Sequence, residues 1–305
     1  MEIRQLRYMV ALAEERSFTR AAMREHIAQP ALSQQIQRLE RELGLALVER
    51  TTRRVTITEA GELLVARARR ILAELTAAED ELQSLRGFQT GRVTVGAIHT
   101  MGPIDLSAAL ASYHRRHPFV ELTVREHSSE ELADLLRLDE LDLAFLSVTE
   151  RIESHGLALE QLVSEELVAA VPRDHRLTGR DRIRMAELAG EQFISYRTGA
   201  RLRELLEEGA HQSGFEPNVK FESNESQRIR ALVARGLGVA IIPRSDAVAS
   251  GPAIAIASLT EPELNRDITL AWRADRRHSP AATEFLALVR DLYAGPIAVS
   301  GLKSD

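Results

Sequence analysis

The chain has no cysteine among its 305 residues. Disulfide bonds, thiolate catalysis, thiol redox sensing and zinc sites built on cysteine are therefore excluded. It also has no run of about 18 apolar residues, the length at which a membrane-spanning helix is expected. Its first residues, Met-Glu-Ile-Arg-Gln-Leu-Arg, lack the apolar region of a secretory signal. We therefore expect a cytoplasmic protein with no membrane partner.

The signatures of common enzyme sites are also missing. The sequence contains no Gly-x-x-x-x-Gly-Lys phosphate loop, no Gly-x-Ser-x-Gly nucleophile elbow and no His-Glu-x-x-His metal helix. The glycines of the segment 95–102 are wrongly spaced for a dinucleotide fingerprint. His114 and His117 could share a helix face, but two surface histidines are the simpler interpretation. We expect no catalytic residue, no metal site and no cofactor.

Charge is unevenly distributed along the chain. Hydrophobic residues make up 44% and charged residues 28%, as in a globular protein, and 305 residues suffice for two or three domains. Residues 1–58 contain ten Arg against seven Glu and no Asp, a net charge of +3, which leaves −9 for the remaining 247 residues. A basic head on an acidic body is typical of a protein whose one end contacts phosphates.

The basic head is expected to hold three short helices. Leu6, Met9 or Val10, and Ala13 have the spacing of a helix with one buried face. Thr19 is placed to cap a second helix running from Arg20 to about His26.

The third helix of the head is the most informative. Pro30 suits its first position, and Gly44 suits a left-handed cap at its end. Between them a stripe of apolar residues at steps of three and four predicts a buried face, made of Leu32, Ile36, Leu39 and Leu43.

The opposite face of this third helix is polar. Its exposed positions are Gln29, Pro30, Ser33, Gln34 and Gln37. Glutamine can pair bidentately with adenine, and serine can serve several bases. We also place Thr19 at this surface, and Arg38 is suited to phosphates. An amphipathic helix with a solvated polar face remains the alternative for this segment taken alone.

A short basic hairpin follows the third helix. Residues 47–48 and 55–58 read as strands around the turn Arg50-Thr-Thr-Arg-Arg. Arg53 and Arg54 at its tip could enter an adjacent minor groove, although a solvated charged turn is the alternative. The order of elements predicts a helix-turn-helix with a wing, which places a helix in the major groove of double-stranded DNA.

The segment after the wing carries a heptad pattern. Apolar residues recur at alternating steps of four and three: Leu64, Ala68, Ile71, Leu75, Ala78, Leu82 and Leu85. Such a seam needs a partner helix, and we expect a homodimer held chiefly by Leu64, Ile71, Leu75, Leu82 and Leu85. A long helix packed on its own domain is the alternative. Two heads related by a two-fold axis would read an inverted repeat.

These segments carry a resemblance to the LysR-type transcriptional regulators. It is dense over about 65 residues and lies in Arg4-Gln-Leu-Arg-Tyr, Ser17-Phe-Thr-Arg-Ala-Ala, Gln29-Pro-Ala-Leu-Ser, Leu39-Glu-Arg-Glu-Leu-Gly and Thr58-Glu-Ala-Gly. The resemblance implies a winged helix-turn-helix head, a dimerising linker helix and a two-lobed effector-binding domain. It also implies that dimers pair into homotetramers, and it allows for RNA polymerase as a partner.

From residue 92 strand-like and helix-like segments alternate, which predicts a parallel-rich α/β body. The expected strands are 93–98, 120–126, 143–146, 167–171, 193–194, 219–221, 239–242 and 267–272, and the expected helices are 103–117, 129–138, 201–212, 225–235 and 280–292. The body resembles the two-lobed periplasmic-binding-protein-like fold. The expected domains are the head 1–58, the linker 59–88 and the body 92–305, whose lobe 1 comprises 92–161 and 266–295 and whose lobe 2 comprises 162–265.

Ligands of such folds bind beyond the carboxyl ends of strands and at helix N-termini. Hydroxyls and one cation follow the expected strands, and these candidate effector-binding residues are Thr100, Met101, Ser128, Ser129, Ser147, Arg197, Thr198 and Ser223. For Thr100 the resemblance adds an effector-binding hydroxyl at this strand end. A simple helix cap is the alternative for each hydroxyl.

The expected function is therefore an effector-controlled transcription factor. It would bind an inverted repeat as a dimer or tetramer, and a small, anionic effector would change its geometry. A constitutive architectural DNA-binding protein and an enzyme fused to a DNA-binding head are the alternatives.

Overall fold

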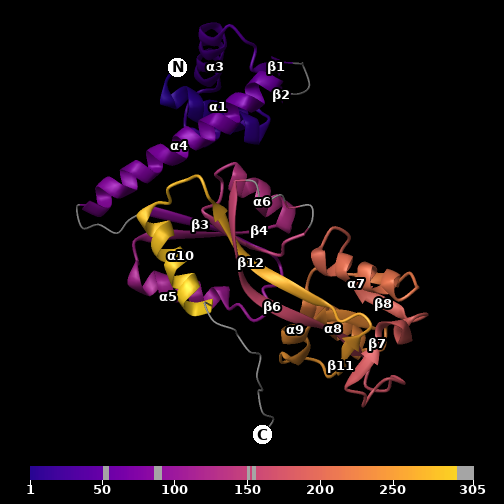
Figure 1. Cartoon of the computed structure of the whole chain (residues 1–305). Helices are drawn as coiled ribbons and strands as arrows, with labels where there is room; N and C mark the ends of the chain where they lie inside the picture. The colour runs from indigo at the N-terminus through magenta and orange to yellow at the C-terminus, as the bar shows by residue number, and fades with distance from the viewer. Residues whose placement is uncertain (51–54, 86–90, 150–151, 153–155, 294–305) are drawn as a thin grey trace. The chain divides into compact units, whose positions relative to one another are not determined.

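The structure, a computed structural model, describes residues 1–50, 55–85, 91–149, 152 and 156–293. Contacts divide the chain into two units, one formed mainly by Met1–Thr90 and the other by most of the residues from Gly91 onward (Figure 1). Within the described ranges, no helix combines the length and the apolar character that crossing a membrane requires.

The first unit is a winged helix-turn-helix followed by a long helix. Its elements are α1 (Ile3–Glu15), α2 (Phe18–Arg24), α3 (Gln29–Leu43), β1 (Val48–Arg50), β2 (Val55–Ile57) and α4 (Glu59–Leu85). β1 and β2 pair in antiparallel register and form the base of the wing. The predicted tip residues Arg53 and Arg54 lie outside the described residues.

The core of this unit confirms the helical periodicity. Leu32, Ile36 and Leu39 of α3 are fully buried, whereas Leu43 is largely exposed because the helix ends there. The helix closes on Gly44, whose φ of +67° gives the expected left-handed cap.

Two expected helix starts are wrong. The side chain of Ser17, not Thr19, caps α2 by accepting the N–H of Arg20, so Thr19 lies inside the helix. Either hydroxyl could cap, and the turn after α1 brings Ser17 to the helix start. α3 begins one residue earlier than expected, so Pro30 takes its second position, where a backbone N–H also lacks an intrahelical partner.

The second unit is built on a twisted mixed sheet. Its strands are β3 (Gly91–Ala97), β4 (Val120–Glu126), β5 (Leu143–Leu146), β6 (Leu157–Val171), β7 (Arg182–Arg184), β8 (Gln192–Ser195), β9 (Asn218–Glu222), β10 (Ala240–Pro243), β11 (Ala255–Thr260) and β12 (Asn265–Arg273). The main sheet has the order β4-β3-β5-β12-β6-β11-β7, with β10 also on β6, and β8 pairs with β9 in a second sheet.

Helices cover both faces of the lobe 1 part of this sheet. They are α5 (Leu106–Arg116), α6 (Ser129–Arg137) and α10 (Pro280–Tyr293). Leu143 and Phe145 of β5 pack in the cluster that contains α5 and α10, whereas Ala144 and Leu146 pack in the cluster that contains α6. Successive residues of a strand point to opposite faces, so α6 lies across the sheet from α5 and α10 (Figure 1).

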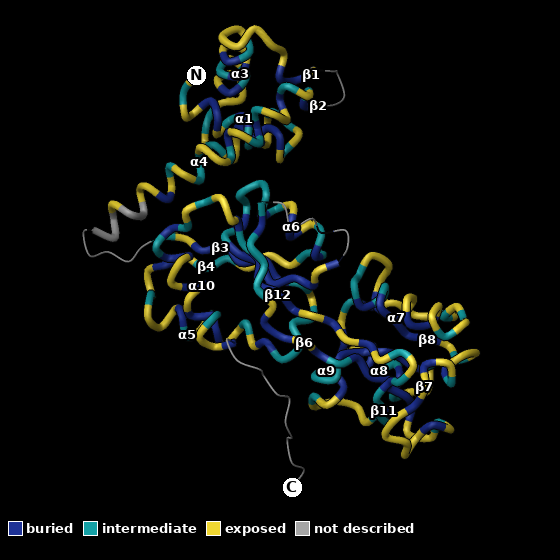
Figure 2. The backbone as a smooth tube through the Cα atoms, in the orientation of Figure 1, coloured by how far each residue is buried: buried dark blue, intermediate teal, exposed yellow. Residues whose placement is uncertain are grey.

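Lobe 2 has a core of its own. It gathers around α7 (Arg201–Gln212), α8 (Ser226–Ala234), α9 (Arg244–Val248) and the short 3-10 helix η1 (Met185–Leu188). The long strand β6 enters both cores: Leu162 and Val163 belong to lobe 1, and Leu167 to lobe 2. β12 runs antiparallel to it, so two adjacent strands connect the lobes, and Figure 2 shows buried positions along both.

The body departs from the expected pattern in several ways, and β7, β11 and α9 were not expected at all. Four of its described strand pairings are parallel and four antiparallel, so the sheet is mixed and not parallel-rich. β6 begins at Leu157, ten residues before the expected strand. α5 begins at Leu106 and not at Pro103, because Asp105 caps it by accepting the N–H of Ala108.

Candidate functional site

The polar face of α3 is open to solvent. Gln29, Pro30, Gln34 and Gln37 are exposed and Ser33 is half-buried, on the side of the helix opposite its buried stripe. Thr19 is exposed on α2, the helix that packs against α3. The structure therefore exposes the predicted base-reading residues Gln29, Gln34 and Gln37 to solvent.

Arg38 is less free than the sequence suggested. Its Nε donates to Glu42 at 3.1 Å, and its Nη2 lies 3.7 Å from a carboxylate oxygen of Glu2. The N-terminal ammonium of Met1, hydrogen-bonded to Glu42, and Arg38 together hold the pKa of the Glu42 carboxyl below its ordinary value. A phosphate would have to compete with two carboxylates for this guanidinium.

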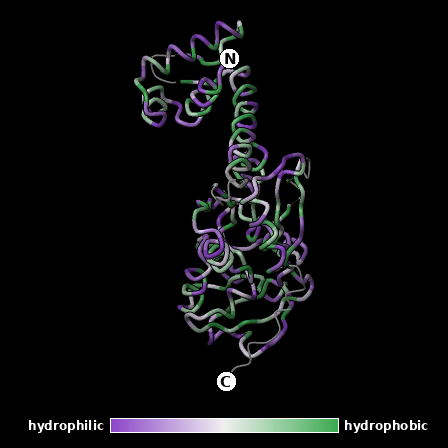
Figure 3. Tube along the Cα trace, turned by 90° about the vertical axis from the view of Figure 1, so that its left-hand side faces the viewer, coloured by the Kyte–Doolittle hydropathy of each residue, from purple (hydrophilic) through white to green (hydrophobic). Residues whose placement is uncertain are grey.

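The predicted dimer seam on α4 is partly used within the head. Leu64 packs against the core of the first unit, as the alternative of a helix on its own domain requires. The side chain of Ile71 is 43% exposed and that of Leu82 is 63% exposed, so the described part of the head does not cover them. Leu75 is half-buried. Hydrophilic and hydrophobic residues alternate along this helix in Figure 3, and the side chain of Leu85 lies outside the described residues.

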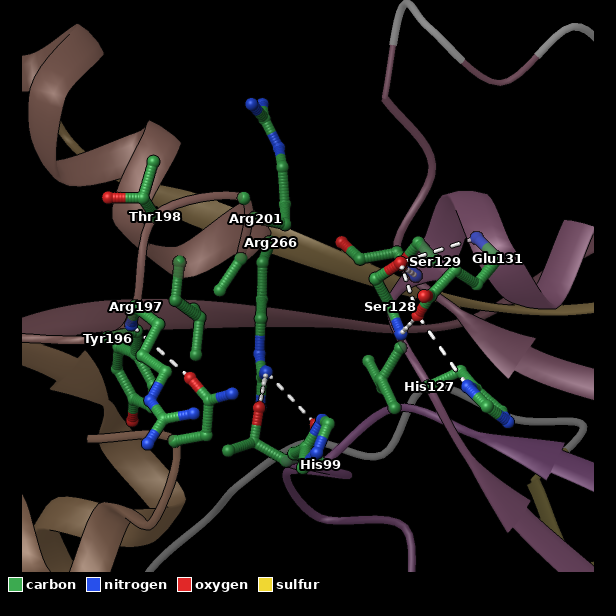
Figure 4. A pocket seen from close by; sticks show the side chains of 17 residues that line it. His99, His127, Ser128, Ser129, Glu131, Tyr196, Arg197, Thr198, Arg201 and Arg266 are labelled. Atoms are coloured by element: carbon green, nitrogen blue, oxygen red, sulfur yellow. Dashed lines mark hydrogen bonds and ion pairs between the residues drawn. The ribbon is translucent and has the colours of Figure 1, made fainter. Parts of the chain in front are cut away.

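A cavity of about 380 Å³ lies between the two lobes of the second unit (Figure 4). Six of the eight predicted effector residues line it: Thr100, Ser128, Ser129, Ser147, Arg197 and Thr198. Figure 4 shows Ser128 and Ser129 on one side and Tyr196, Arg197 and Thr198 on the other. The strand ends of both lobes thus meet at one pocket, which we call the interlobe pocket.

Thr100 is held by a buried ion pair at the crossing strands. Arg266 of β12 and Glu165 of β6 are each 1% exposed, and Nη2 of the arginine lies 2.9 Å from Oε2 of the glutamate. Nη1 of Arg266 donates to the hydroxyl of Thr100 at 2.6 Å and to its carbonyl at 3.0 Å. Because the hydroxyl oxygen accepts from Arg266, its own proton can be donated to a ligand.

The segment after Thr100 is a turn and not the helix start that we expected there. Residues 101–104 form a turn, closed by the N–H of Ile104 donating to the carbonyl of Met101. Gly102 in this turn has φ +57°, and a Cβ there would meet the carboxylate of Glu165. The glycine therefore lets the loop lie directly on the buried ion pair.

The start of α6 supplies the other hydroxyls. Ser128 caps the helix in a reciprocal box: its N–H and hydroxyl donate to Glu131, whose N–H donates back to Ser128 Oγ. The hydrogen bond from the backbone N–H of Ser128, and after it the bond from the Ser128 hydroxyl, hold the pKa of the Glu131 carboxyl below its ordinary value. Ser129 is buried, and its Oγ accepts the N–H of Ser147 at 3.0 Å. The hydroxyl proton of Ser129 can then serve a ligand, whereas Ser128 acts mainly as the cap.

The lobe 2 side of the pocket combines a helix start with charge. α7 begins at Arg201 after Ala200, whose methyl side chain cannot cap the first N–H groups. Arg201 is paired with Glu204 and Glu208, so its charge is already neutralised. The backbone N–H of Arg197 donates to Asn224, while no ion pair forms at its guanidinium within the described residues. Arg197 is the pocket arginine whose charge a ligand can use.

Met101 and Ser223 do not line the interlobe pocket. Both line an adjoining cavity of about 550 Å³ on the other side of the Thr100 loop. Ser223 is buried there, and its Oγ accepts the N–H of Glu225, the residue that precedes α8. The structure thus places these two residues outside the interlobe pocket, and their role as effector contacts stays a prediction.

A buried polar chain joins the two cavities. The hydroxyl of Tyr196, at the interlobe pocket, lies 2.8 Å from Ser226 Oγ, which donates to Asp246 at 2.6 Å. Burial raises the pKa of the Asp246 carboxyl, against the opposing hydrogen bond from Ser226. Burial likewise raises the pKa of the Tyr196 phenol.

Sequence reasoning missed several residues that line the interlobe pocket: His127, Glu131, Tyr196, Arg201 and Arg266. Arg266 carried little signal, since it lies at the start of β12 between the polar residues Asn265 and Asp267, and its partner Glu165 lies in the other crossing strand. Among the described residues no cluster of His, Asp or Glu could hold a metal ion, and His117 contacts Glu284 instead.

Comparison with known proteins identifies both units. Residues 3–62 match the model of the bacterial regulatory helix-turn-helix protein, lysR family, and residues 86–294 match the LysR substrate binding domain. The chain is 34% identical to the DNA-binding transcriptional dual regulator OxyR of Escherichia coli over 281 residues, covering 90% of each chain. It is 33% identical to the HTH-type transcriptional regulator YybE of Bacillus subtilis over 285 residues, covering 93% of this chain and 97% of YybE.

A solved structure agrees over the same length. Full-length OxyR from Pseudomonas aeruginosa, in a cysteine-to-aspartate variant, superposes with a TM-score of 0.73 at 29% identity, covering 95% of this chain and 94% of that one. The winged head, the long α4 and the two-lobed domain thus occur together in a relative. This chain belongs to the LysR family of DNA-binding transcriptional regulators, which bind small-molecule effectors and are not enzymes.

Proposed function

We propose that the interlobe pocket binds a small anionic effector, which controls how this regulator holds its DNA. The observation that carries the proposal is the convergence of the starts of α6 and α7, the hydroxyls of Thr100 and Ser129 and the guanidinium of Arg197 on one cavity. Helix N-termini present unpaired N–H groups and the positive end of the dipole, which favour an anion.

The guanidinium of Arg197 supports an anion over a neutral ligand, whereas the carboxylate of Glu131, which also lines the pocket, is held by the start of α6. Glu165 neutralises Arg266, and Glu204 and Glu208 neutralise Arg201. The exposed Arg197 retains its positive charge at the pocket wall. A carboxylate or phosphate could pair with it while accepting protons from the two hydroxyls.

The cavity volume restricts the effector to a small molecule. About 380 Å³ lies at the lower end of the range for ligand pockets, roughly 300–1,000 Å³. Ile98, Tyr196 and Leu202 add apolar surface to the lining. We therefore propose a compact organic anion with a modest apolar part.

A thermal-shift screen of the full-length protein tests this proposal. Small carboxylates and phosphates would be compared with their neutral amides or alcohols, and hits would be measured by calorimetry. We expect only the anions, and not their neutral analogues, to stabilise the protein. The variant Arg197→Gln should bind these anions more weakly. Equal stabilisation by the neutral analogues would refute an anion site.

Peroxide sensing through thiols is not open to this chain. Several relatives are named hydrogen peroxide-inducible genes activators, such as that of Dickeya chrysanthemi, 34% identical over 277 residues. This chain has no cysteine, so neither a disulfide nor a sulfenic acid can form. We therefore propose that a reversibly bound ligand regulates this protein.

For the DNA complex we propose the assignments made from the sequence. The bases would be contacted by Gln29, Pro30, Ser33, Gln34 and Gln37. The DNA backbone or the minor groove would be contacted by Thr19, Arg38, Arg53 and Arg54. The solvent exposure of the α3 face supports the first group. A protein that acts on chromosomal DNA would work in the cytoplasm.

For the assembly we propose a homodimer through the exposed part of α4, with Ile71, Leu75 and Leu82 at its centre, and tetramers formed from two dimers. The uncovered leucine and isoleucine on this helix support it. We keep the domain bounds 1–58, 59–88 and 92–305, with lobe 2 at 162–265. The position of the two cores along β6 supports the lobe division.

A further inference from the structure

The side chains of Glu40 and Thr58 hold the start of the wing. We call residues 46–48, which end at the first residue of β1, the wing base. The backbone N–H groups of Leu47 and Val48 donate to one oxygen, Oε1 of Glu40, at 2.9 and 3.1 Å. Glu40 lies on α3, so the recognition helix itself supplies the acceptor for the strand that follows it.

Thr58, the residue just before the linker helix α4, also holds the wing base. The hydroxyl of Thr58 donates to the carbonyl of Ala46 at 2.7 Å and accepts the N–H of Gly61 at 3.0 Å, which caps the first turn of α4. A Cβ on Gly61 would collide with the carbonyl of Leu47 and with Ile57. The first turn of α4 therefore lies in direct contact with the wing base.

We propose that Glu40 is a positioning residue for DNA reading, which fixes the wing on the recognition helix. Because Thr58 ties α4 to the same wing base, α3, the wing and the start of α4 move as one body. A change in the geometry of the linker helices then reaches DNA as a displacement of the whole head. The wing does not move separately against the recognition helix.

The chemistry of the contact explains the need for a long acidic side chain. Two N–H groups share one carboxylate oxygen, and such charge-assisted bonds are stronger than neutral ones. A glutamine at this position keeps an oxygen of the same reach, whereas an alanine leaves both N–H groups without this acceptor. Glu40→Gln should therefore retain much of what Glu40→Ala loses.

The experiment measures DNA discrimination by the full-length protein, using fluorescence anisotropy on three duplexes. One is the upstream DNA of its own gene, one has the major-groove bases of the footprint changed, and one has the flanking minor-groove base pairs changed. Glu40→Ala and Glu40→Gln are compared with the wild type. Glu59→Ala is the matched control, because it removes an exposed carboxylate next to Thr58.

We expect Glu40→Ala to lose about tenfold in preference for the natural flank while keeping its preference for the natural major-groove bases. Glu40→Gln should fall between Glu40→Ala and the wild type, and Glu59→Ala should match the wild type. An equal loss of both preferences in Glu40→Ala, or no loss of either, would overturn the proposal.

Hydrogen exchange of the wild-type protein gives a second measurement that needs no variant. The amides of Leu47 and Val48 should be protected to the same degree as those of α3, because Glu40 holds them to that helix. Exchange at the rate of an unstructured loop would overturn the proposal even if Glu40→Ala failed to fold.

Discussion

Replacing Thr100 by valine removes one hydroxyl from the interlobe pocket and little else. Nη1 of Arg266 donates to both the hydroxyl and the carbonyl of Thr100, at 2.6 and 3.0 Å, so the guanidinium keeps a partner in the variant. The lost bond nevertheless joins a charged group, so we expect a loss in stability of about 1.5–3 kcal/mol, which is a shift in Tm of about 3–12 °C.

The effect of this substitution on effector binding should be of similar size. A hydrogen bond from the hydroxyl to an anion contributes about 1.5–3 kcal/mol. Since about 1.4 kcal/mol corresponds to a factor of ten, Thr100→Val should raise the Kd of the anion about 10- to 150-fold. Calorimetric titration with an anion found by screening gives this ratio directly.

The matched control for this prediction is Thr94→Val. Thr94 is buried on β3, the strand that precedes Thr100 in the sequence, and does not line the pocket. It should leave the Kd of the anion unchanged. An unchanged Kd in Thr100→Val, or equal losses in both variants, would refute the role assigned to the Thr100 hydroxyl.

Three further predictions concern the head, the linker and the buried acid. Gln34→Ala should cost about 1–3 kcal/mol on specific DNA and relax the base preference, measured by anisotropy on base-substituted duplexes; a uniform loss on all duplexes would contradict base reading. Ile71→Glu with Leu82→Glu should place charges in the apolar seam and shift the mass seen by light scattering toward the monomer; an unchanged mass would rule out this seam. Burial raises the pKa of Asp246, so the folded state holds this proton more tightly than the unfolded chain. The stabilisation from Asp246 is then complete below the ordinary aspartate pKa and is lost as pH rises through the raised value. Asp246→Asn should flatten the pH dependence of urea unfolding over that window, and an unchanged profile would contradict the assignment.

The head could be predicted well because its signals are local. The stripe Leu32, Ile36 and Leu39 and the cap at Gly44 depend on residues a few positions apart. The start of α2 could not be fixed, since Ser17 and Thr19 both carry a hydroxyl and the preceding turn decides between them.

The body was predicted less well because its decisive contacts are distant in sequence. The first half of β6 escaped notice because polar residues such as Glu160 and Gln161 interrupt its apolar pattern, and its pairing with β12 determines that it is a strand. Glu165 and Arg266 lie 101 residues apart, so neither showed that it would be neutralised by the other. The hydroxyls at the strand ends were recognised, but the arginine that orients Thr100 was not.

The measurement that tests the central claim most directly is an anisotropy titration of the full-length protein on its own upstream DNA and on scrambled DNA, across a salt series. It would be run with and without the screened anion, for the wild type and for Thr100→Val. We predict sequence-dependent, salt-sensitive binding that the anion changes in the wild type and changes far less in the variant. An anion that binds the wild type yet leaves affinity, DNA footprint and DNA bending unaltered would contradict the account.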